Sequence, residues 1–429
     1  MKIINTRIQG VKAAEEYLSP KYSESAGRIS DTVRGIISDV RERGDAALLE
    51  LGQRFDSPLL QSVKVSDGEI EAAYGQIDAG LLEAIRQAIK NVGDFHAMQK
   101  QKSWIDVKDG VIYGQTVTPI DCVGFYAPGG LAPYPSTVIM CAVPGMIAGV
   151  RRMLMTTPAQ KDTGTIHPAM LVAAAECGVR DIFKIGGAQA IAAMAFGTGT
   201  VPRADKIVGP GNAFVAEAKR QLFGYVGIDQ IAGPSEILIL CDDSADPEYV
   251  AADMLSQAEH AEDSRCAVVT TSERIFDRLP AVLERQTGGA LREKMIRASL
   301  GSAGALILCA DMDEGVRLAN VFAPEHLELQ TESPWDTLKG IKNAGAIMIG
   351  HHTPVPVCDF AAGPNHTLPT SGTSRFTSAL SVDEYVKKSG ILSFNEKGLK
   401  EVAPAALALA ECEGFEAHAN TIKIRTGDK

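Results

Sequence analysis

Residues 236–242 read EILILCD, a run in which five apolar residues follow one another directly. An uninterrupted apolar run of this length is typical of a β-strand that is covered on both faces of its sheet. Six more runs of this kind occur along the chain, at residues 152–158, 181–187, 206–211, 266–271, 305–311 and 346–350. Because Ala-rich helical stretches separate them, the pattern predicts an α/β fold built on parallel sheets.

This number of strands exceeds what one compact nucleotide-binding unit needs, so we expect two related sheets. Their boundaries are expected near Tyr126 and Ser235, because both residues lie in Gly- and Pro-rich segments, YAPGG and IAGPSE. Such segments are common at hinges and in loops that face ligands. Residues 26–56 and 68–102 have apolar positions at three- and four-residue spacing, which predicts helices.

The two ends of the chain differ from its middle. The first 20 residues and the last 50 lack the strand alternation. Residues 399–419 are Ala-rich and predict a helix that is broken only by Pro404. Neither end resembles an independent domain, so we expect both ends to pack on a partner subunit.

Composition sets the class of protein. The chain has 429 residues, of which 45 % are hydrophobic and 22 % charged, and its net charge of −11 argues against a nucleic-acid-binding surface. The N-terminal MKIINTRIQG lacks the features of a targeting segment, and the most apolar window, residues 136–150, is too short to span a membrane. The eight cysteines form no C-x-x-C pair, which predicts free thiols in a reducing cytoplasm.

The segment MLSQAEHAEDS, residues 254–264, contains a candidate cation site. Asp246 followed by Pro247 predicts the start of its helix, since Asp is a common N-cap and Pro is common at the first helical position. On that helix Gln257 and His260 would share one face, whereas Glu259 would point roughly 160° away from Gln257. The first two could hold one cation, but the segment alone favours an ordinary polar helix end.

The dipeptide Glu325-His326 is a candidate acid and base. A histidine that titrates near neutrality is the usual general base, and an adjacent carboxylate can tune it or activate water. Both side chains could act together only at a helix start or in a loop that borders a cleft, and Pro324 favours the helix start. A Glu-His dipeptide is common by chance, so the pair needs further support.

Polar residues also gather in two segments nearer the C-terminus. Asp359, Asn365 and His366 lie in the Gly- and Pro-rich stretch 356–369, where an irregular backbone often fixes site residues. Glu413 and His418 follow the predicted C-terminal helix. The alternatives are a turn with a surface histidine in the first case and a solvated chain end in the second.

Three Gly-rich elements could face an anion: YAPGG at 126–130, GGAQ at 186–189 and GPGN at 209–212. The last two follow strand-like runs and precede Ala-rich helices, so backbone N–H groups at a helix start are available. None matches G-x-G-x-x-G or a P-loop, so the nucleotide fingerprint is incomplete.

Taken in order, eight segments resemble the histidinol dehydrogenase family over nearly the whole chain: YAPGG, GGAQAIAAMAFGT, DKIVGPGN, IAGPSE, LSQAEH, FAPEHLEL, DFAAGPNHTLPTSG and EGFEAH. The resemblance implies a zinc enzyme that oxidises an amino alcohol through an aldehyde to a carboxylate with two NAD+. It also implies an intertwined homodimer with two Rossmann-like domains. The implied parts are a dimerisation segment at 1–25, a first Rossmann-like domain with the zinc and catalytic residues at 26–125 and 236–378, a second with the NAD contacts at 126–235, and a segment exchanged between subunits at 379–429.

The resemblance also implies residue roles. One zinc per subunit would be held by Gln257, His260, Asp359 and His418, the last coming from the partner subunit. Substrate would contact these four residues together with Ser235, His326, His366 and Glu413. The acid–base pair would be Glu325 and His326, and NAD would contact Tyr126, Gln189 and Asn212.

Three positions depart from the family pattern. Cys358 stands where Gly is usual, Gln230 where Met is usual and Gly199 where Glu is usual. Because Gln230 lies five residues before Ser235, its change bears on the substrate pocket.

The resemblance implies a cytoplasmic enzyme that oxidises L-histidinol to L-histidine. The alternative is a paralogue that oxidises another small alcohol, such as a sulfonated propanediol. A metal-binding scaffold without catalysis is disfavoured, because the Glu325-His326 pair is intact.

Overall fold

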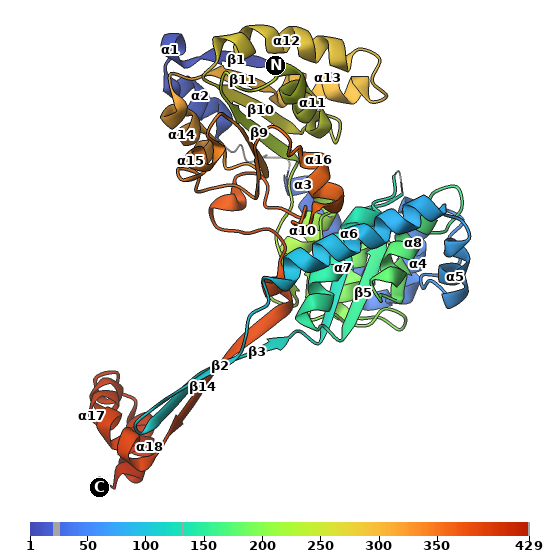
Figure 1. The fold of residues 1–429 in the computed structure, drawn as a ribbon. Helices are drawn as coiled ribbons and strands as arrows, with labels where there is room; N and C mark the ends of the chain where they lie inside the picture. Colours follow the sequence, from blue (N-terminus) through green and yellow to red (C-terminus); the bar gives the residue numbers. More distant parts are fainter. Residues whose placement is uncertain (20–25, 131, 428–429) are drawn as a thin grey trace. The chain divides into compact units, whose positions relative to one another are not determined.

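The structure is a computed structural model that describes residues 1–19, 26–130 and 132–427 (Figure 1). The chain divides into two compact units, Met1–Gln99 with Ile120–Tyr385 and Lys100–Pro119 with Val386–Lys429. The first unit contains two parallel sheets, each with helices on both faces, so the predicted α/β class with two related sheets is confirmed. Within the described ranges, no helix is both long and apolar enough to cross a membrane.

The larger sheet of the first unit has six strands in the order β1-β11-β10-β9-β12-β13, and all of its pairings are parallel. Counted from β9, five of these strands follow the order 3-2-1-4-5 of a Rossmann half, and β1 extends the edge. The strands are β1 (Lys2–Asn5), β9 (Glu236–Cys241), β10 (Arg265–Thr270), β11 (Ala305–Leu308), β12 (His326–Gln330) and β13 (Ala346–Ile349). Neither β1 nor β12 is among the strands predicted from the sequence.

The opening stretch EILILCD forms β9, which lies in the middle of this sheet. Its alternate side chains enter two different cores: Ile237 and Ile239 pack with α11, α12 and α13, whereas Leu238 and Leu240 pack with α2 and α14. The continuous apolar run therefore reflects burial on both faces, as predicted.

The helices that accompany the larger sheet are α1 (Thr6–Gln9), α2 (Val11–Leu18), α11 (Pro247–Ala258), α12 (Glu273–Thr287), α13 (Glu293–Ala303), α14 (Met312–Phe322), α15 (Pro334–Leu338) and α16 (Val355–Val357). Three short helical turns follow them along the chain: η1 (Cys358–Ala362), η2 (Thr373–Arg375) and η3 (Val382–Tyr385).

The smaller parallel sheet has the order β6-β5-β4-β7-β8, which is again 3-2-1-4-5 when counted from its first strand. Its strands are β4 (Cys122–Tyr126), β5 (Arg152–Thr157), β6 (Asp181–Lys184), β7 (Lys206–Val208) and β8 (Gly227–Ile228). Its helices are α3 (Ala26–Arg43), α4 (Asp45–Phe55), α5 (Asp67–Tyr74), α6 (Ala79–Ala97), α7 (Pro135–Ala148), α8 (Pro168–Glu176), α9 (Gly187–Phe196) and α10 (Ala213–Leu222).

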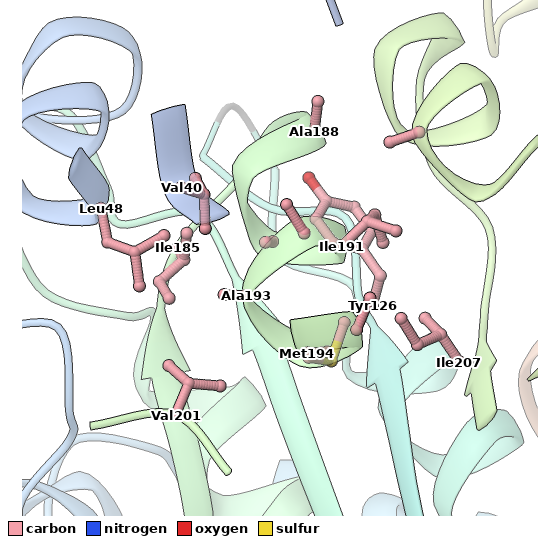
Figure 2. Packing of buried hydrophobic residues seen from close by; sticks show 14 of the residues in the cluster. Val40, Leu48, Tyr126, Ile185, Ala188, Ile191, Ala193, Met194, Val201 and Ile207 are labelled. Atoms are coloured by element: carbon pink, nitrogen blue, oxygen red, sulfur yellow. The ribbon is translucent and has the colours of Figure 1, made fainter. Parts of the chain in front are cut away.

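Helices α3 and α4 pack on this smaller sheet. Val40 of α3 and Leu48 of α4 share one core with Ile185, Ile191 and Met194 (Figure 2). The resemblance implies that the segment 26–125 accompanies the six-stranded sheet, but apolar contacts join its first helices to α9 and α10.

The second unit is an antiparallel sheet with two helices. Its strands, β2 (Trp104–Lys108), β3 (Val111–Pro119) and β14 (Val386–Phe394), lie in the order β14-β3-β2. Helix α17 (Glu396–Cys412) continues through Pro404, so the predicted break there is wrong. The break falls at 413–415, where the chain turns before α18 (Glu416–Thr426). A proline costs a helix one backbone hydrogen bond but does not always end it.

Candidate active site

The first unit contains a cavity of about 290 Å³ at the amino ends of β9 and β12. Seven of the residues that the resemblance implies for the active site line it: Ser235, Gln257, His260, Glu325, His326, Asp359 and His366. These residues are spread over more than a hundred positions of the sequence, and the sheet brings them together. Glu413 and His418 do not line this cavity, since they belong to the second unit.

The acid–base pair lies at the start of a strand. Helix α14 ends at Ala323, which has a left-handed backbone conformation with φ of 51°, and Pro324 leads directly into β12. The prediction that Pro324 starts a helix is therefore wrong. A proline shortly after a helix end is common, and here it starts an extended segment whose first residues face the cavity.

His326 has an acceptor beside each ring nitrogen. Its Nδ1 lies 3.1 Å from the carbonyl oxygen of Glu236 and 3.5 Å from the Glu325 carboxylate, and its Nε2 lies 3.2 Å from Oδ1 of Asp359. The ring is buried, with 3 % of the residue exposed. This arrangement fixes the ring plane and directs one nitrogen towards the carboxylate of Asp359.

Burial and charge act in opposite directions on this pair. Burial alone would lower the pKa of His326, but Glu325 and Asp359 stabilise the imidazolium and raise its pKa to about 9. Burial raises the pKa of Glu325 to about 7, although His326 opposes that change. A carboxyl group that ionises near neutrality can act as either an acid or a base under physiological conditions.

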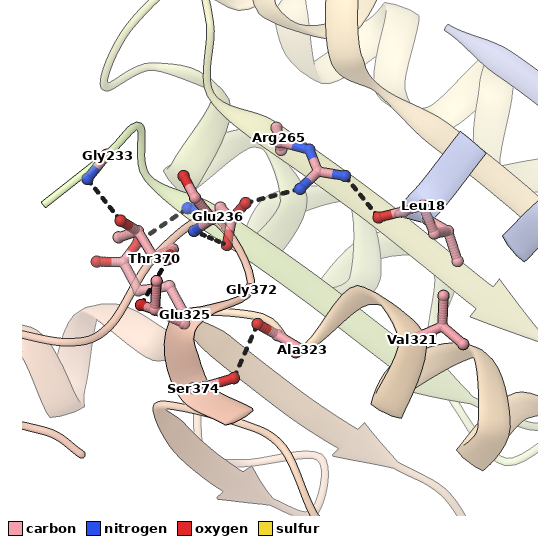
Figure 3. A network of polar contacts seen from close by, with 12 residues as sticks. Leu18, Gly233, Glu236, Arg265, Val321, Ala323, Glu325, Thr370, Gly372 and Ser374 are labelled. Atoms are coloured by element: carbon pink, nitrogen blue, oxygen red, sulfur yellow. Dashed lines mark hydrogen bonds and ion pairs between the residues drawn. The ribbon is translucent and has the colours of Figure 1, made fainter. Parts of the chain in front are cut away.

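Glu236 organises the pair from the neighbouring strand (Figure 3). Its backbone N–H donates to Glu325 at 2.8 Å, and its carbonyl oxygen lies beside His326. Its own buried carboxylate accepts from Arg265 at 2.9 Å and from the backbone N–H of Ser371 at 3.0 Å. Sequence analysis did not single out Glu236, although an acidic residue at the head of the apolar run EILILCD was a usable signal.

Gln257 and His260 lie at the end of α11. The helix starts as predicted, because Asp246 caps it by accepting from the backbone N–H of Glu248 at 2.8 Å. It ends at Ala258, however, so His260 lies in the following turn and does not share a helical face with Gln257. Its backbone N–H donates to the Gln257 carbonyl at 3.2 Å, and this turn places both residues at the cavity.

Asp359 and His366 form a second connected pair. Asp359 lies in η1, a π-helical turn, a rare conformation that is frequent at functional sites. Nδ1 of His366 lies 2.8 Å from the carbonyl oxygen of Asp359, and its Nε2 lies 3.2 Å from Oγ1 of Thr137. Burial lowers the pKa of His366, so the ring is neutral and its Nδ1–H donates to that carbonyl. Thr137 lines the same cavity, and no sequence pattern indicated it as a site residue.

The donor set fits a cation, although it does not form a ready metal site by itself. In residues 1–19, 26–130 and 132–427, no group of three or more His, Cys, Asp and Glu side chains is arranged to hold a metal. Of those residue types, the implied zinc set contributes only His260 and Asp359 to this cavity, because Gln257 supplies an amide and His418 lies in the other unit. The Oε1 atom of Gln257 is buried and has no hydrogen-bond partner among the described residues. An unsatisfied buried oxygen costs about 1–3 kcal/mol, which a bound cation would offset.

The charge state of His260 also suits a ligand. Desolvation lowers its pKa, an effect that the charge of Asp359 partly opposes, so the ring is neutral at pH 7 although part of the residue is exposed. Metal binding requires a neutral imidazole.

A second cavity of about 540 Å³ lies at the carboxyl ends of the smaller sheet's strands. Tyr126, Gln189 and Asn212 line it, as the resemblance implies for NAD contacts. Tyr126 ends β4, and its hydroxyl accepts from the backbone N–H of Gly187 at 3.3 Å. Nε2 of Gln189 is a buried donor without a partner, so it is available to a ligand acceptor.

Asn212 has a structural role as well. It caps α10, and its Oδ1 accepts from the backbone N–H groups of Phe214 and Val215. The capping bond leaves the amide nitrogen as the side-chain group for a ligand. Helices α9 and α10 both begin at this cavity, as the Gly-rich elements predicted. Asp56 also lines it, and its position could not be inferred from its sequence neighbours.

The comparisons agree with this geometry. The family model of histidinol dehydrogenase matches residues 20–426. The histidinol dehydrogenase of Clostridium acetobutylicum is 47 % identical over 409 residues, which cover 95 % of each chain, and that of Bacillus subtilis is 47 % identical over 422 residues, which cover 98 % of each chain. The crystal structure of histidinol dehydrogenase from Elizabethkingia anophelis superposes with a TM-score of 0.93 at 35 % identity, covering 99 % of this chain and 98 % of that one. The chain therefore belongs to the histidinol dehydrogenase family of NAD-dependent oxidoreductases.

Proposed function

We propose that the protein oxidises L-histidinol to L-histidine through L-histidinal, with NAD+ as the hydride acceptor and zinc as a resident metal. The observation that carries this proposal is the position of His326, which is fixed between Asp359 and Glu325 inside a cavity lined by candidate metal ligands. Gln257, His260 and Asp359 would hold zinc together with His418 of the partner subunit. When bound, zinc orients the substrate and polarises the oxygen that it contacts.

His326 performs the first proton transfer. It takes the proton of the alcohol's hydroxyl group, while the carbon that bears this hydroxyl transfers a hydride to NAD+. The products are the aldehyde and NADH. If Asp359 were engaged as a metal ligand, it would stabilise the imidazolium less, so the pKa of His326 would lie lower and the neutral base would be available.

Glu325 performs the second activation. With a pKa of about 7, its carboxylate can take a proton from water that attacks the aldehyde. The hydrate then loses a second hydride to a second NAD+, and the product is the carboxylate. His366, held neutral by burial, can position the substrate by accepting a hydrogen bond at Nε2, because its Nδ1–H is donated to the Asp359 carbonyl.

The test measures NADH formation by purified protein supplied with zinc, NAD+ and L-histidinol. We expect two NADH for each histidinol. The variant His326→Asn should lose the alcohol step while keeping zinc, and His352→Asn serves as a matched control, because His352 is exposed and does not line the cavity. Unchanged turnover in His326→Asn would remove that residue from the mechanism.

One observation favours the alternative substrate class. Gln230 lines the cavity, its Nε2 donates to the carbonyl of Leu368 at 2.8 Å, and its Oε1 is buried without a partner. A substrate with an additional donor near that oxygen would satisfy it. A panel that includes histidinol and a sulfonated propanediol decides between them: turnover of another alcohol without turnover of histidinol would reject histidinol as the substrate.

We further propose a homodimer with shared active sites, in which the C-terminal segment 379–429 is exchanged. The segment 1–25 is proposed only as a dimerisation segment, since β1 pairs with β11 of its own chain and Ala14 and Leu18 of α2 lie in the same core. Residues 20–25 lie outside the described part of the chain. His418 and Glu413 are exposed on the second unit and so are accessible to a partner. A mixture of His418→Ala and His326→Asn chains should regain activity after subunit exchange, whereas no recovery would indicate a site within one chain. A cytoplasmic location is proposed because all eight cysteines are free and most are buried.

A further inference from the structure

Strand β12 carries an unusual row of buried polar side chains. Leu327 and Leu329 point into the core shared with α2 and α14, so His326, Glu328 and Gln330 occupy the opposite face of the strand. All three are buried, and Glu328 is only 1 % exposed. The corresponding face of β9, the next strand in the sheet, is apolar. Parallel strands covered on both faces are normally apolar, so the polar row requires a reason.

The row continues onto α11 through a pair of carboxyl groups. Nε2 of Gln330 donates to Oδ2 of Asp253 and to Oε2 of Glu328, each at 2.8 Å. The other oxygen of Glu328, Oε1, accepts from the backbone N–H of Val355 at 3.1 Å. The two carboxyl groups are also hydrogen-bonded to each other, which requires one of them to carry a proton.

The proton belongs on Glu328. Burial raises the pKa of Glu328 well above its usual range, and the charge of Asp253 raises it further. Burial also raises the pKa of Asp253, but the hydrogen bond from Glu328 opposes that change. Two carboxylates in contact within the interior cannot both be ionised, so the pair holds one proton at neutral pH.

We propose that Glu328 donates a shared proton to Asp253 and that this pair is a positioning device for the active site, because it joins the three segments that carry Gln257, His326 and Asp359. The inference rests on the proposed zinc function.

The connections follow from spacing along each element. Asp253 lies one helical turn before Gln257 on α11, and Glu328 lies two residues after His326 on the same face of β12. Val355 begins α16, which leads directly into the π-helical turn of Asp359. Hydrogen bonds are directional, so the pair fixes distances and angles among these segments that apolar contacts would leave free. Outer groups of this kind orient metal ligands, and their loss typically weakens metal affinity about 10–100-fold.

The first test compares two substitutions of one residue in the full chain. Glu328→Gln keeps a donor for Asp253 and an acceptor for Val355, so it should hold zinc within about threefold of the parent. Glu328→Leu removes both and should weaken zinc binding about 10–100-fold, measured by competition with a chelator, and should lower kcat more than it raises KM. Leu329→Ala is the matched control, because it truncates the next residue of β12 on the opposite face and should leave zinc affinity unchanged. If Glu328→Leu does not fold, Asp253→Ala breaks the same pair from the helix.

The second test is the pH dependence of unfolding, which a merely space-filling role would not change. A folded-state pKa above the unfolded value means that the proton on Glu328 stabilises the fold fully below about pH 4.5, and that this contribution is lost as pH rises towards the folded-state pKa. Glu328→Gln has no such proton to lose. Its unfolding midpoint should therefore rise relative to that of the parent as pH increases from about 4.5 towards the folded-state pKa of Glu328.

These measurements test the positioning role, the shared proton and the proposed zinc function separately. Zinc affinity of Glu328→Leu equal to that of the parent, or a loss in Leu329→Ala as large as in Glu328→Leu, would overturn the positioning role. A pH-independent difference between Glu328→Gln and the parent would overturn the shared proton. A parent protein that binds no zinc would overturn the proposed function and the positioning role together, and the pH comparison would still decide whether Glu328 holds a proton.

Discussion

A buried ion pair that contacts Gly209 gives the sharpest prediction about stability. Lys219 of α10 and Asp229 are paired, and their side chains are 2 % and 3 % exposed. Nζ of Lys219 also donates to the carbonyl of Gly209 at 3.0 Å, and Asp229 accepts from the backbone N–H of the same glycine at 2.8 Å. Gly209 has a φ of 102°, and a Cβ there would lie 2.4 Å from the carbonyl oxygen of Tyr126. The pair therefore holds the loop that leads to Asn212.

The expected magnitude follows from burial. Asp229→Asn leaves the ammonium group of Lys219 buried without a counter-charge, which costs about 3–5 kcal/mol of unfolding free energy, and Lys219→Met should cost a similar amount. The double variant Lys219→Met with Asp229→Leu removes both charges and leaves the N–H and C=O of Gly209 unpaired, at about 1–3 kcal/mol each. The double variant should therefore cost less than the sum of the single changes, by roughly 4 kcal/mol.

The assay is urea unfolding followed by circular dichroism, with KM for NAD+ measured on the folded variants. The matched control is Asp181→Asn, which breaks an ion pair with Arg152 on the same sheet at 2.9 Å, because those side chains are 24 % and 50 % exposed. That surface pair should contribute less than about 1 kcal/mol. If Asp229→Asn destabilises the protein no more than Asp181→Asn, or if the single effects simply add, the reasoning from burial is refuted.

Three shorter predictions concern pH, metal and a departure from the family pattern. Burial raises the pKa of Asp56 to about 6, so its proton stabilises the fold at low pH and that contribution is lost as pH rises through 6. Asp56→Asn should therefore be more stable than the parent at pH 7, by up to about 3 kcal/mol, and equally stable near pH 4. Urea unfolding at both pH values measures this difference. Removal of zinc with a chelator should stop NADH formation while leaving NAD+ binding by calorimetry unchanged, and loss of both would mean that the two cavities are coupled. Cys358→Ala should keep zinc stoichiometry and activity within about twofold, because Cys358 is 5 % exposed and packs in the core beside α11; loss of the metal would instead make its thiol a ligand.

Continuous apolar runs located most strands of the two parallel sheets. All seven runs contain strands, and β9, β10 and β11 are buried on both faces, whereas β13 lies at an edge with Ile347 exposed. Strand β4 is also buried but was not predicted. Strand β12 escaped prediction because its sequence, HLELQ, alternates polar and apolar residues although both faces are buried. Its polar face meets Asp253 on α11, and no local pattern indicates a partner so distant in the sequence.

Seven of the residues implied for the site line one cavity, but the sequence did not predict how they are arranged there. Helix spacing correctly separated Glu259 from the candidate site, since Glu259 is exposed and does not line the cavity. The same spacing wrongly placed His260 on a continuing helix, because the helix end at Ala258 carries no glycine or proline signal. Glu236 and Thr137 were missed for another reason: they act through partners on other elements, which only the folded sheets bring within reach.

The two parallel sheets have the same strand order, but their cavities lie at opposite ends of the strands. The charges of the proposed ligands account for this difference. In an open parallel sheet, ligands normally bind beyond the carboxyl ends of the strands, at the point where the strand order reverses. Tyr126 and Asn212 obey that rule at β4 and β7, and helices α9 and α10 begin at the cavity with the positive ends of their dipoles towards it, which suits the NAD+ proposed to bind there.

Ser235 and His326 lie at the equivalent strands β9 and β12 but at their amino ends, where α11 and α14 finish and present the negative ends of their dipoles. The negative dipole ends at the amino ends of these strands disfavour a pyrophosphate and favour a cation and an imidazolium. Each dipole contributes only about 0.3–1 kcal/mol, so the side-chain ligands must supply most of the binding free energy. The end of the sheet at which those side chains lie determines whether they bind a positive or a negative ligand.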